Sequence, residues 1–228
     1  MSEIVERAFS VPVPGVVWEP ADGAVTRLVL LGHGGSGHKR ADRIAGLGRW
    51  FAGRGVAAMA IDGPFHGDRV PAPLSMPDYV AAVAARGAEP VLDRIAADWL
   101  SAIDAAGFRQ IRNIGYSGQS LGARYGLPTA VALGDRLRCV VLGKFGLEST
   151  MDPALDAPGR IRADAARITA PTLFHVQWGD TLFPRAGQFE LFDLLAARDK
   201  RLIAFPGGHG ETPPAALPIW RDFLLEHL

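Results

Sequence analysis

Residues 118–122 read Gly-Gln-Ser-Leu-Gly and follow an apolar run that ends at Tyr116. The segment after them can form a helix, so Ser120 is expected at a sharp turn from a strand into a helix. Small residues two places before and after the serine let the chain fold back until the hydroxyl is exposed above the sheet. A serine held in this way can act as a nucleophile in acyl transfer. The pentapeptide alone is weak evidence, because the chain contains 27 glycines.

Two further residues could complete the chemistry that a nucleophilic serine requires. A serine hydroxyl needs a base within hydrogen-bond reach, and the base needs a partner that fixes its tautomer. Asp180 and His209 each follow a predicted strand, and these two strands are consecutive in the chain. They should therefore lie on adjacent loops at one edge of the sheet. We predict Ser120 as the nucleophile, His209 as the base and Asp180 as the orienting acid, in the chain order found in α/β-hydrolases.

The assignment of the acid has rivals. Glu148 and Asp152 follow a different predicted strand, where some α/β-hydrolases carry the acid. Asp135 and Asp164 are expected to be solvated surface charges. We favour Asp180 as the acid. His209 also has an alternative interpretation, because a histidine among Gly207, Gly208 and Gly210 could be a surface residue of a flexible turn.

Acyl transfer also needs hydrogen-bond donors aimed at the oxyanion of the transition state. The backbone amide of Leu121, the residue after the nucleophile, is one predicted donor, assisted by the N-terminus of the following helix. The second should come from the Gly32-His33-Gly34-Gly35 loop, where missing side chains allow close approach of the backbone. We assign it to Gly35, with Gly34 as the alternative. A tight turn without a ligand would explain the same glycines.

These residues require a fold that gathers strand ends at one edge. Short aliphatic runs typical of buried strands cover residues 26–31, 56–61, 111–116, 137–142, 172–178 and 201–205. Segments with helical spacing of apolar residues cover residues 41–52, 79–106, 123–133, 187–198 and 217–228. This alternation predicts a single α/β domain over residues 1–228, with a mostly parallel central sheet and helices on both faces. Ligands then bind at the carboxyl ends of the strands. Residues 70–77 and 148–164 are expected to be surface excursions.

Over nearly its whole length the chain resembles the α/β-hydrolase superfamily, and within it the dienelactone-hydrolase-like serine esterases. The resemblance rests on the His33-Gly34-Gly35 loop, on residues 118–122, and on Asp180 and His209. It includes the loop Asp62-Gly63-Pro64-Phe65-His66-Gly67 and the turn that begins at Gly179-Asp180. True dienelactone hydrolases use a cysteine nucleophile, whereas position 120 is serine, so their lactone substrate is not carried over. The resemblance implies an α/β-hydrolase fold without a large cap domain.

Composition narrows the class of partner. With 24 basic and 24 acidic residues the formal net charge is zero, so nothing favours nucleic acid or an anionic membrane. The first ten residues carry three charges and no apolar stretch, so we expect neither a signal peptide nor a membrane helix, and a cytoplasmic location. The single cysteine, Cys139, lies in an apolar run and is expected to be a buried, unreactive strand residue. The oligomeric state stays open, a homodimer included.

Three other functions compete with the hydrolase. Gly32 and Gly37 nearly match a phosphate-binding loop, but Lys39 is displaced by one residue and no Ser or Thr follows it. A metal site could use His33, His38, His66 and Asp62, yet no pair has the spacing of metal-binding histidines on a helix. We expect His33 and His66 to hydrogen-bond nearby backbone instead, and we predict no cofactor. A non-catalytic binding protein on the same scaffold would usually lack a member of the triad.

The sequence therefore predicts a serine hydrolase of a small carboxylic ester, lactone or thioester, and transfer of the acyl group to an acceptor other than water is the alternative. The aromatic residues in or near the strand-end loops are the candidates for lining the substrate pocket. They are Phe65, Tyr125, Phe145, Trp178 and Phe183. Residues 64–90 could close over the site as a small lid. This segment is too short for a large independent cap domain, which disfavours bulky lipid substrates.

Overall fold

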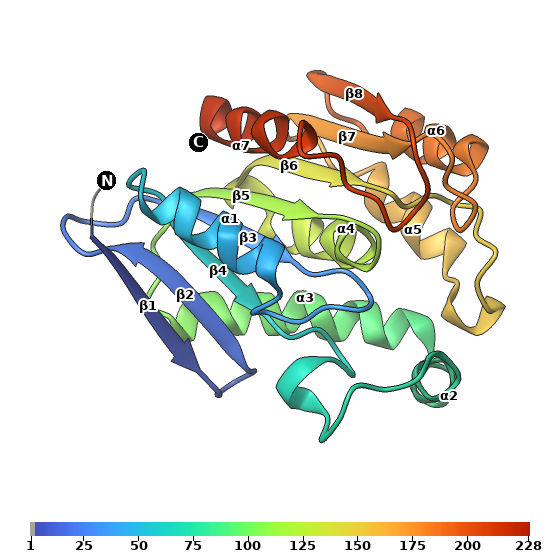
Figure 1. The fold of residues 1–228 in the computed structure, drawn as a ribbon, viewed down its shortest axis with the longest axis horizontal. Helices are drawn as coiled ribbons and strands as arrows, with labels where there is room; N and C mark the ends of the chain where they lie inside the picture. Colours follow the sequence, from blue (N-terminus) through green and yellow to red (C-terminus); the bar gives the residue numbers. More distant parts are fainter. Residues whose placement is uncertain (1–2) are drawn as a thin grey trace.

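The computed structural model, which describes residues 3–228, is built on one eight-stranded sheet (Figure 1). In chain order the strands are β1 (Ile4–Phe9), β2 (Gly15–Pro20), β3 (Arg27–Gly32), β4 (Ala57–Ile61), β5 (Asn113–Gly118), β6 (Leu137–Gly143), β7 (Thr172–Gln177) and β8 (Lys200–Phe205). Across the sheet they are ordered β1-β2-β4-β3-β5-β6-β7-β8. Strands β1, β2 and β4 pair in antiparallel fashion, and every pair from β4 to β8 is parallel. The carboxyl ends of β3 to β8 therefore meet at one edge.

Helices cover both faces of the sheet, as Figure 1 shows. They are α1 (Asp42–Ala52), α2 (Met76–Arg86), α3 (Ala88–Ala105), α4 (Leu121–Leu133), α5 (Pro158–Ala165), α6 (Arg185–Leu194) and α7 (Ala216–His227), with short 3-10 helices at η1 (Gly67–Arg69), η2 (Gly134–Arg136) and η3 (Pro153–Leu155). Strand β3 shows why two layers are needed: Leu28 and Leu30 join the core under α3 and α4, while Val29 and Leu31 join the core under α1 and α7. A parallel strand buried on both faces reads as a continuous apolar run. The predicted α/β architecture and its six parallel strands are confirmed.

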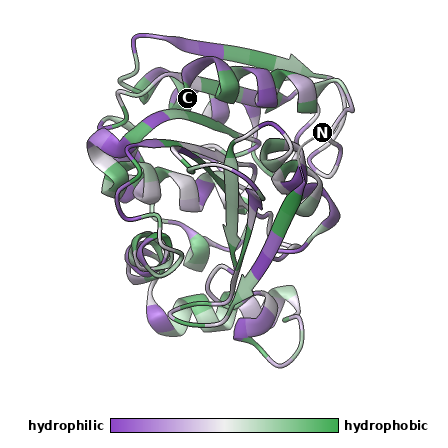
Figure 2. Cartoon of the chain, turned by 90° about the vertical axis from the view of Figure 1, so that its left-hand side faces the viewer, coloured by the Kyte–Doolittle hydropathy of each residue, from purple (hydrophilic) through white to green (hydrophobic). Residues whose placement is uncertain are grey.

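Strands β1 and β2 are absent from the strands predicted from the sequence, so that prediction was incomplete at the N-terminal edge of the sheet. Strand β1 lies at the edge of the sheet and is mostly exposed, with Glu6 and Arg7 interrupting its apolar residues. In Figure 2 the strand near the N-terminus accordingly changes from green to purple and back along its length. Periodicity does not single out such a strand, because an edge strand with few buried positions lacks the apolar run of a central one.

Two predictions about helices also need correction. The segment 79–106 is not one helix: α2 ends at Arg86, and the φ of 87° at Gly87 breaks the helical path before α3 begins at Ala88. The apolar spacing continues across the break, so the pattern alone joins the two helices. Residues 148–164 are not only a surface excursion, because they form η3 and most of α5, with Leu155 and Ile161 in the core. Asp164 is likewise 2% exposed and paired with Arg160 (2.8 Å) rather than solvated.

Cys139 lies in the middle of β6 and is fully buried, as expected. Burial raises the pKa of its thiol to about 12, which keeps the sulfur protonated and unreactive at neutral pH. Among residues 3–228, no helix combines the length and the apolar character that crossing a membrane would require.

Candidate active site

Ser120 stands between β5 and α4 in the strained turn that the sequence predicts. Its φ of 58° is unusual for a residue other than glycine, and its amide donates a hydrogen bond to the Gly143 carbonyl at the end of β6 (2.9 Å). The flanking glycines are required by contact: a Cβ on Gly118 would lie 2.3 Å from the Gly122 carbonyl oxygen, and one on Gly122 would lie 2.7 Å from the Gly32 carbonyl oxygen. The turn therefore packs backbone against backbone, and Ser120 is held at the carboxyl edge of the sheet.

Ser120, His209 and Asp180 form one chain of hydrogen bonds. Ser120 Oγ lies 2.9 Å from His209 Nε2, and His209 Nδ1 lies 2.8 Å from Asp180 Oδ2. The second carboxylate oxygen of Asp180 accepts from the amides of Leu182 and Phe183, both at 2.9 Å. Because an ionised carboxylate only accepts hydrogen bonds, His209 Nδ1 must donate to it, which leaves Nε2 free to accept the serine proton. The Asp180 side chain is fully buried and that of His209 is 22% exposed, so the acid is shielded while the base remains reachable.

The loop after β3 is fixed by His33. Its Nε2 accepts from the Gly63 amide (2.9 Å), so its Nδ1 carries the proton and donates to the Gly34 carbonyl (2.8 Å), which also accepts from the Gly37 amide (3.0 Å). Burial lowers the pKa of His33 to about 4, which keeps the ring neutral and preserves both roles. The N–H of a trans peptide points away from its C=O, so the two bonds to the Gly34 carbonyl also set the direction of the Gly35 N–H.

His66 provides a second brace for this loop. Its Nε2 lies 2.9 Å from the Gly35 carbonyl, and its Nδ1 lies 2.8 Å from the Pro64 carbonyl. Both histidines therefore bond to nearby backbone, as predicted, and their rings lie 5.1 Å apart. Within residues 3–228, no group of three or more His, Cys, Asp or Glu side chains is arranged to hold a metal ion.

Asp62 links the same two loops through its buried carboxylate. It accepts from the Lys39 amide (2.9 Å), the Lys39 ammonium (2.7 Å) and the Asp68 amide (2.8 Å). Lys39 also pairs with the Asp68 carboxylate at 2.5 Å. The lysine of the near-match to a phosphate-binding loop is thus engaged in holding the β3 and β4 loops together.

The five aromatic residues proposed for the pocket are in different settings. Phe183 lies 5.5 Å from the His209 ring and 5.1 Å from Phe145, measured between ring centroids. Tyr125 is buried, with its hydroxyl 3.2 Å from that of Tyr79 on α2. The structure brings Phe145 and Phe183 together beside the candidate base.

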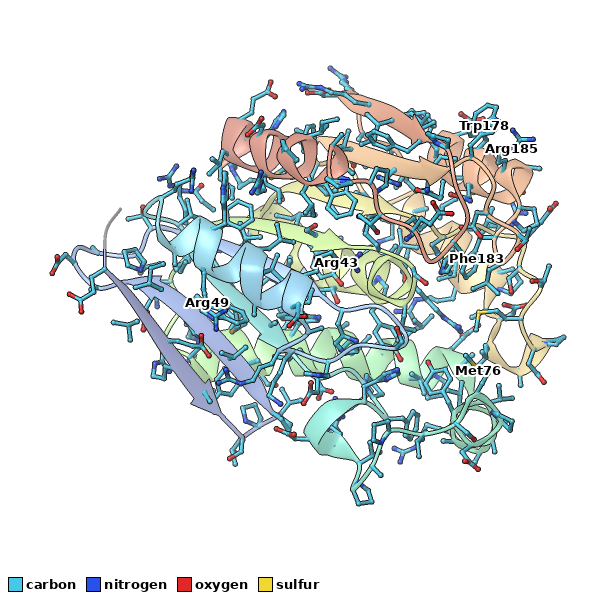
Figure 3. All side chains as sticks on the ribbon, viewed as in Figure 1. Arg43, Arg49, Met76, Trp178, Phe183 and Arg185 are labelled. Atoms are coloured by element: carbon cyan, nitrogen blue, oxygen red, sulfur yellow. The ribbon has the colours of Figure 1, made fainter. Side chains whose placement is uncertain are left out.

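The other two aromatic residues lie farther out. Phe65 packs against Tyr79, with ring centroids 6.3 Å apart, and lines a separate cavity with Arg69. Trp178 is 52% exposed and stacks on Arg185 at 4.3 Å; Figure 3 shows these two side chains together, away from Phe183. Tyr79 places α2, part of the predicted lid, against the layer that carries Tyr125.

The rival acids take no part in the hydrogen-bond chain. Glu148 is exposed, and Asp152 caps η3 by accepting from the Ala154 amide (2.8 Å). Within the described residues, the His209 ring bonds to no carboxylate other than Asp180.

Lys144 is a residue that the sequence reasoning missed. It follows Gly143 with a φ of 50° and is 4% exposed, and its ammonium donates to the Glu211 carbonyl (2.9 Å) and to Thr212 Oγ1 (3.3 Å). Burial and the nearby Arg43 lower the pKa of Lys144 to about 8. The end of β6 therefore supports both the serine turn, through Gly143, and the chain just after His209. The sequence does contain one signal for Lys144, because this lysine directly follows the apolar strand β6.

Comparison with known proteins places this geometry in a family. A cold-adapted esterase from an Arctic intertidal metagenomic library is 32% identical, with 99% of this chain and 94% of that chain covered and a TM-score of 0.83. The chain belongs to the α/β-hydrolase superfamily. A Klebsiella pneumoniae protein assigned as a dienelactone hydrolase (18% identity, 98% of both chains, TM-score 0.74) shares the fold. So does a Paleococcus ferrophilus monoacylglycerol lipase (21% identity, 99% and 100%, TM-score 0.68). No protein-family model and no curated protein matches the sequence of this α/β-hydrolase.

Proposed function

We propose that this α/β-hydrolase is a serine hydrolase that cleaves small carboxylic esters, including lactones or thioesters, through an acyl-enzyme on Ser120. The observation that carries the proposal is the unbroken path of hydrogen bonds from Ser120 Oγ through His209 to the buried carboxylate of Asp180, at 2.9 and 2.8 Å. The esterase that is 32% identical over nearly the whole chain supports the reaction class.

Acylation begins when Ser120 Oγ attacks the carbonyl carbon of the ester while its proton passes to His209 Nε2. The resulting imidazolium is stabilised by the Asp180 carboxylate, which is already fixed by the amides of Leu182 and Phe183. The C–O bond to the alcohol then breaks, and His209 returns the proton to the leaving oxygen. Water enters, loses a proton to His209, and attacks the acyl carbon. The bond from this carbon to Ser120 Oγ then breaks while His209 returns the proton to Oγ, which releases the acid and regenerates both residues.

The oxyanion of both tetrahedral intermediates needs donors that are in place before reaction. Leu121 is the first residue of α4, so its amide has no acceptor within the helix. Gly35 is exposed at the same edge, and its N–H is oriented through the bonds that His33 and Gly37 make to the Gly34 carbonyl. We assign these two amides to the oxyanion. His33 then acts as a positioning residue, because it touches the loop and not the substrate.

The test is a series of chromogenic esters of graded acyl length on the wild type and on Ser120→Ala. Wild type should hydrolyse short esters and should react with a fluorophosphonate probe at one serine. Ser120→Ala should lose both, with an unchanged unfolding transition as evidence that it is folded. Equal hydrolysis by the two proteins would refute Ser120 as the nucleophile. A folded wild type that is inert towards every ester and the probe would refute the enzyme.

A further inference from the structure

Arg124 carries a buried positive charge without a partner. It is the only charged residue in the sequence of α4 and is 8% exposed. Among residues 3–228, its guanidinium makes no ion pair, hydrogen bond or cation–π contact. The buried Lys39, Asp98 and Asp164 each form an ion pair, and the buried ammonium of Lys144 donates to the Glu211 carbonyl and to Thr212. Arginine stays protonated in proteins, and an opposite charge stabilises a guanidinium that has little access to water. Arg124 is therefore free to bind an anion.

The location of Arg124 connects it to the candidate active site. It lies one helical turn after Ser120, and its amide donates to the Ser120 carbonyl (3.0 Å). Side chains on a helix lean towards its N-terminus, so the long side chain extends back towards the serine end of α4. Arg124 lines a cavity together with Phe145 and Phe183, and the Phe183 ring lies 5.5 Å from that of His209. Phe183 thus connects the cavity that Arg124 lines to the candidate base, which does not itself line the cavity.

The cavity is lined by Arg124, Phe145 and Phe183 among other residues. Its volume of about 20 Å³ admits a small terminal group and not a long chain. A planar guanidinium matches a carboxylate, which can accept two parallel hydrogen bonds from it. Phe145 and Phe183 would pack against the carbon chain that carries the carboxylate.

Asp156 is the carboxylate of the chain that lines the same cavity. It forms no ion pair with Arg124 within 4.0 Å and is exposed on the segment between η3 and α5. An internal pair between these two residues in solution is the competing explanation of Arg124, and it makes a different prediction for the variants below.

We propose that Arg124 binds a carboxylate carried by the substrate, so that the preferred esters are small and anionic, such as monoesters of short dicarboxylic acids. The proposal rests on the proposed function, because the cavity is a substrate pocket only if Ser120 is the nucleophile. It predicts selectivity within the ester class: the charged group is recognised at Arg124, and the reaction occurs at Ser120.

The experiment compares kcat/KM for monoethyl succinate with kcat/KM for ethyl 4-methylpentanoate, in which an isopropyl group replaces the carboxylate. Wild type should prefer the charged ester. In Arg124→Gln this preference should fall by about 10- to 150-fold, the range expected for a lost hydrogen bond to a charged group. The matched control is Arg112→Gln, which removes an exposed arginine just before β5, at the other end of that strand from Ser120, and should keep the wild-type ratio. An unchanged ratio in Arg124→Gln overturns the proposal.

A binding measurement separates failure of this inference from failure of the proposed function. Succinate should raise the thermal midpoint of Ser120→Ala but not that of Ser120→Ala with Arg124→Gln, whether or not any ester is hydrolysed. Arg124→Gln should be about as stable as wild type, because the Arg124 side chain forms no ion pair or hydrogen bond that the substitution would remove. If Arg124→Gln and Asp156→Asn are both destabilised and succinate has no effect, the internal pair is correct and the proposal is wrong. Ester hydrolysis that depends on Ser120 without charge preference would refute the inference alone.

Discussion

Acid should destabilise this α/β-hydrolase through His33, the brace of the loop after β3. Burial lowers the pKa of His33 from 6.5 to about 4 in the folded protein. As the pH falls, the unfolded chain therefore takes up this proton before the folded chain does. The stability contributed by the neutral ring is complete above pH 6.5 and is lost as the pH approaches 4. A pKa difference of this size corresponds to about 3 kcal/mol of unfolding free energy.

His33→Asn isolates this contribution. The asparagine amide can still donate to the Gly34 carbonyl, but nothing then accepts from the Gly63 amide, which is buried. At pH 7 the variant should lose about 1–3 kcal/mol for the unsatisfied amide. Because asparagine does not titrate, the stability difference should move by about 3 kcal/mol in favour of the variant between pH 7 and pH 4, so that the gap closes or reverses. His175, whose pKa burial also lowers to about 4, acts equally on both proteins and cancels in the difference.

The assay is urea unfolding followed by tryptophan fluorescence at half-unit steps from pH 4 to pH 7. Ser36→Ala, an exposed change in the same loop that does not titrate, is the control and should keep the full acid loss of the wild type. A pH-independent gap between wild type and His33→Asn would refute the reasoning. The His33→Ala variant adds a catalytic readout: loss of both bonds should lower kcat by about 10-fold or more with KM little changed, since removing an oxyanion donor outright costs about 10²- to 10³-fold.

Three further predictions concern the serine turn, the acid and the brace behind His209. Asp180→Asn should lower kcat by about 10⁴-fold with little change in stability, whereas Glu148→Gln should keep near-wild-type turnover; the reverse pattern would transfer the acid role. Gly118→Ala should destabilise the protein by about 1–3 kcal/mol, measured in urea, because its Cβ would meet the Gly122 carbonyl. The pKa of Lys144 is about 8 in the folded protein, below its ordinary 10.5, so the folded protein releases this proton at lower pH than the unfolded chain. The unfolding free energy of the wild type should therefore gain a contribution as the pH rises from 8 to 10.5. Lys144→Met should lack that gain, and a parallel pH profile would contradict the assignment.

The positions that sequence could predict share a local cause. Ser120 lies between a buried strand and a helix, and Asp180 and His209 follow buried strands, so the apolar runs alone bring the three residues to one edge of the sheet. The hydrogen bonds that then join them were not predictable in detail, because they depend on loop paths. The Asp180 carboxylate, for example, is oriented by the amides of Leu182 and Phe183, which any residue type could supply.

The positions that sequence missed depend on contacts between distant segments. The ammonium of Lys144 meets the carbonyl of Glu211, 67 residues later, and Lys39 meets Asp62 across two loops. A pattern read along the chain brings the strand-end loops to one edge of the sheet, but it does not specify which side chains then meet between these loops. The edge strand β1 fails for a related reason, since its pairing with β2 stabilises it although its own residues are mostly exposed.

One local signal nevertheless marks both the missed brace and the proposed specificity residue. Lys144 directly follows an apolar strand, and Arg124 interrupts an apolar helix, so each is a lone charge where the surrounding pattern predicts burial. Burying a charge is unfavourable unless the fold or a ligand compensates it. For Lys144 the compensation is internal, through the Glu211 carbonyl and Thr212. For Arg124 no partner is present among residues 3–228, although Ser120 and Phe183 lie nearby. The cost of burying a charge thus identifies Lys144 as a structural residue, and it supports the proposal that Arg124 binds a charged group of the substrate.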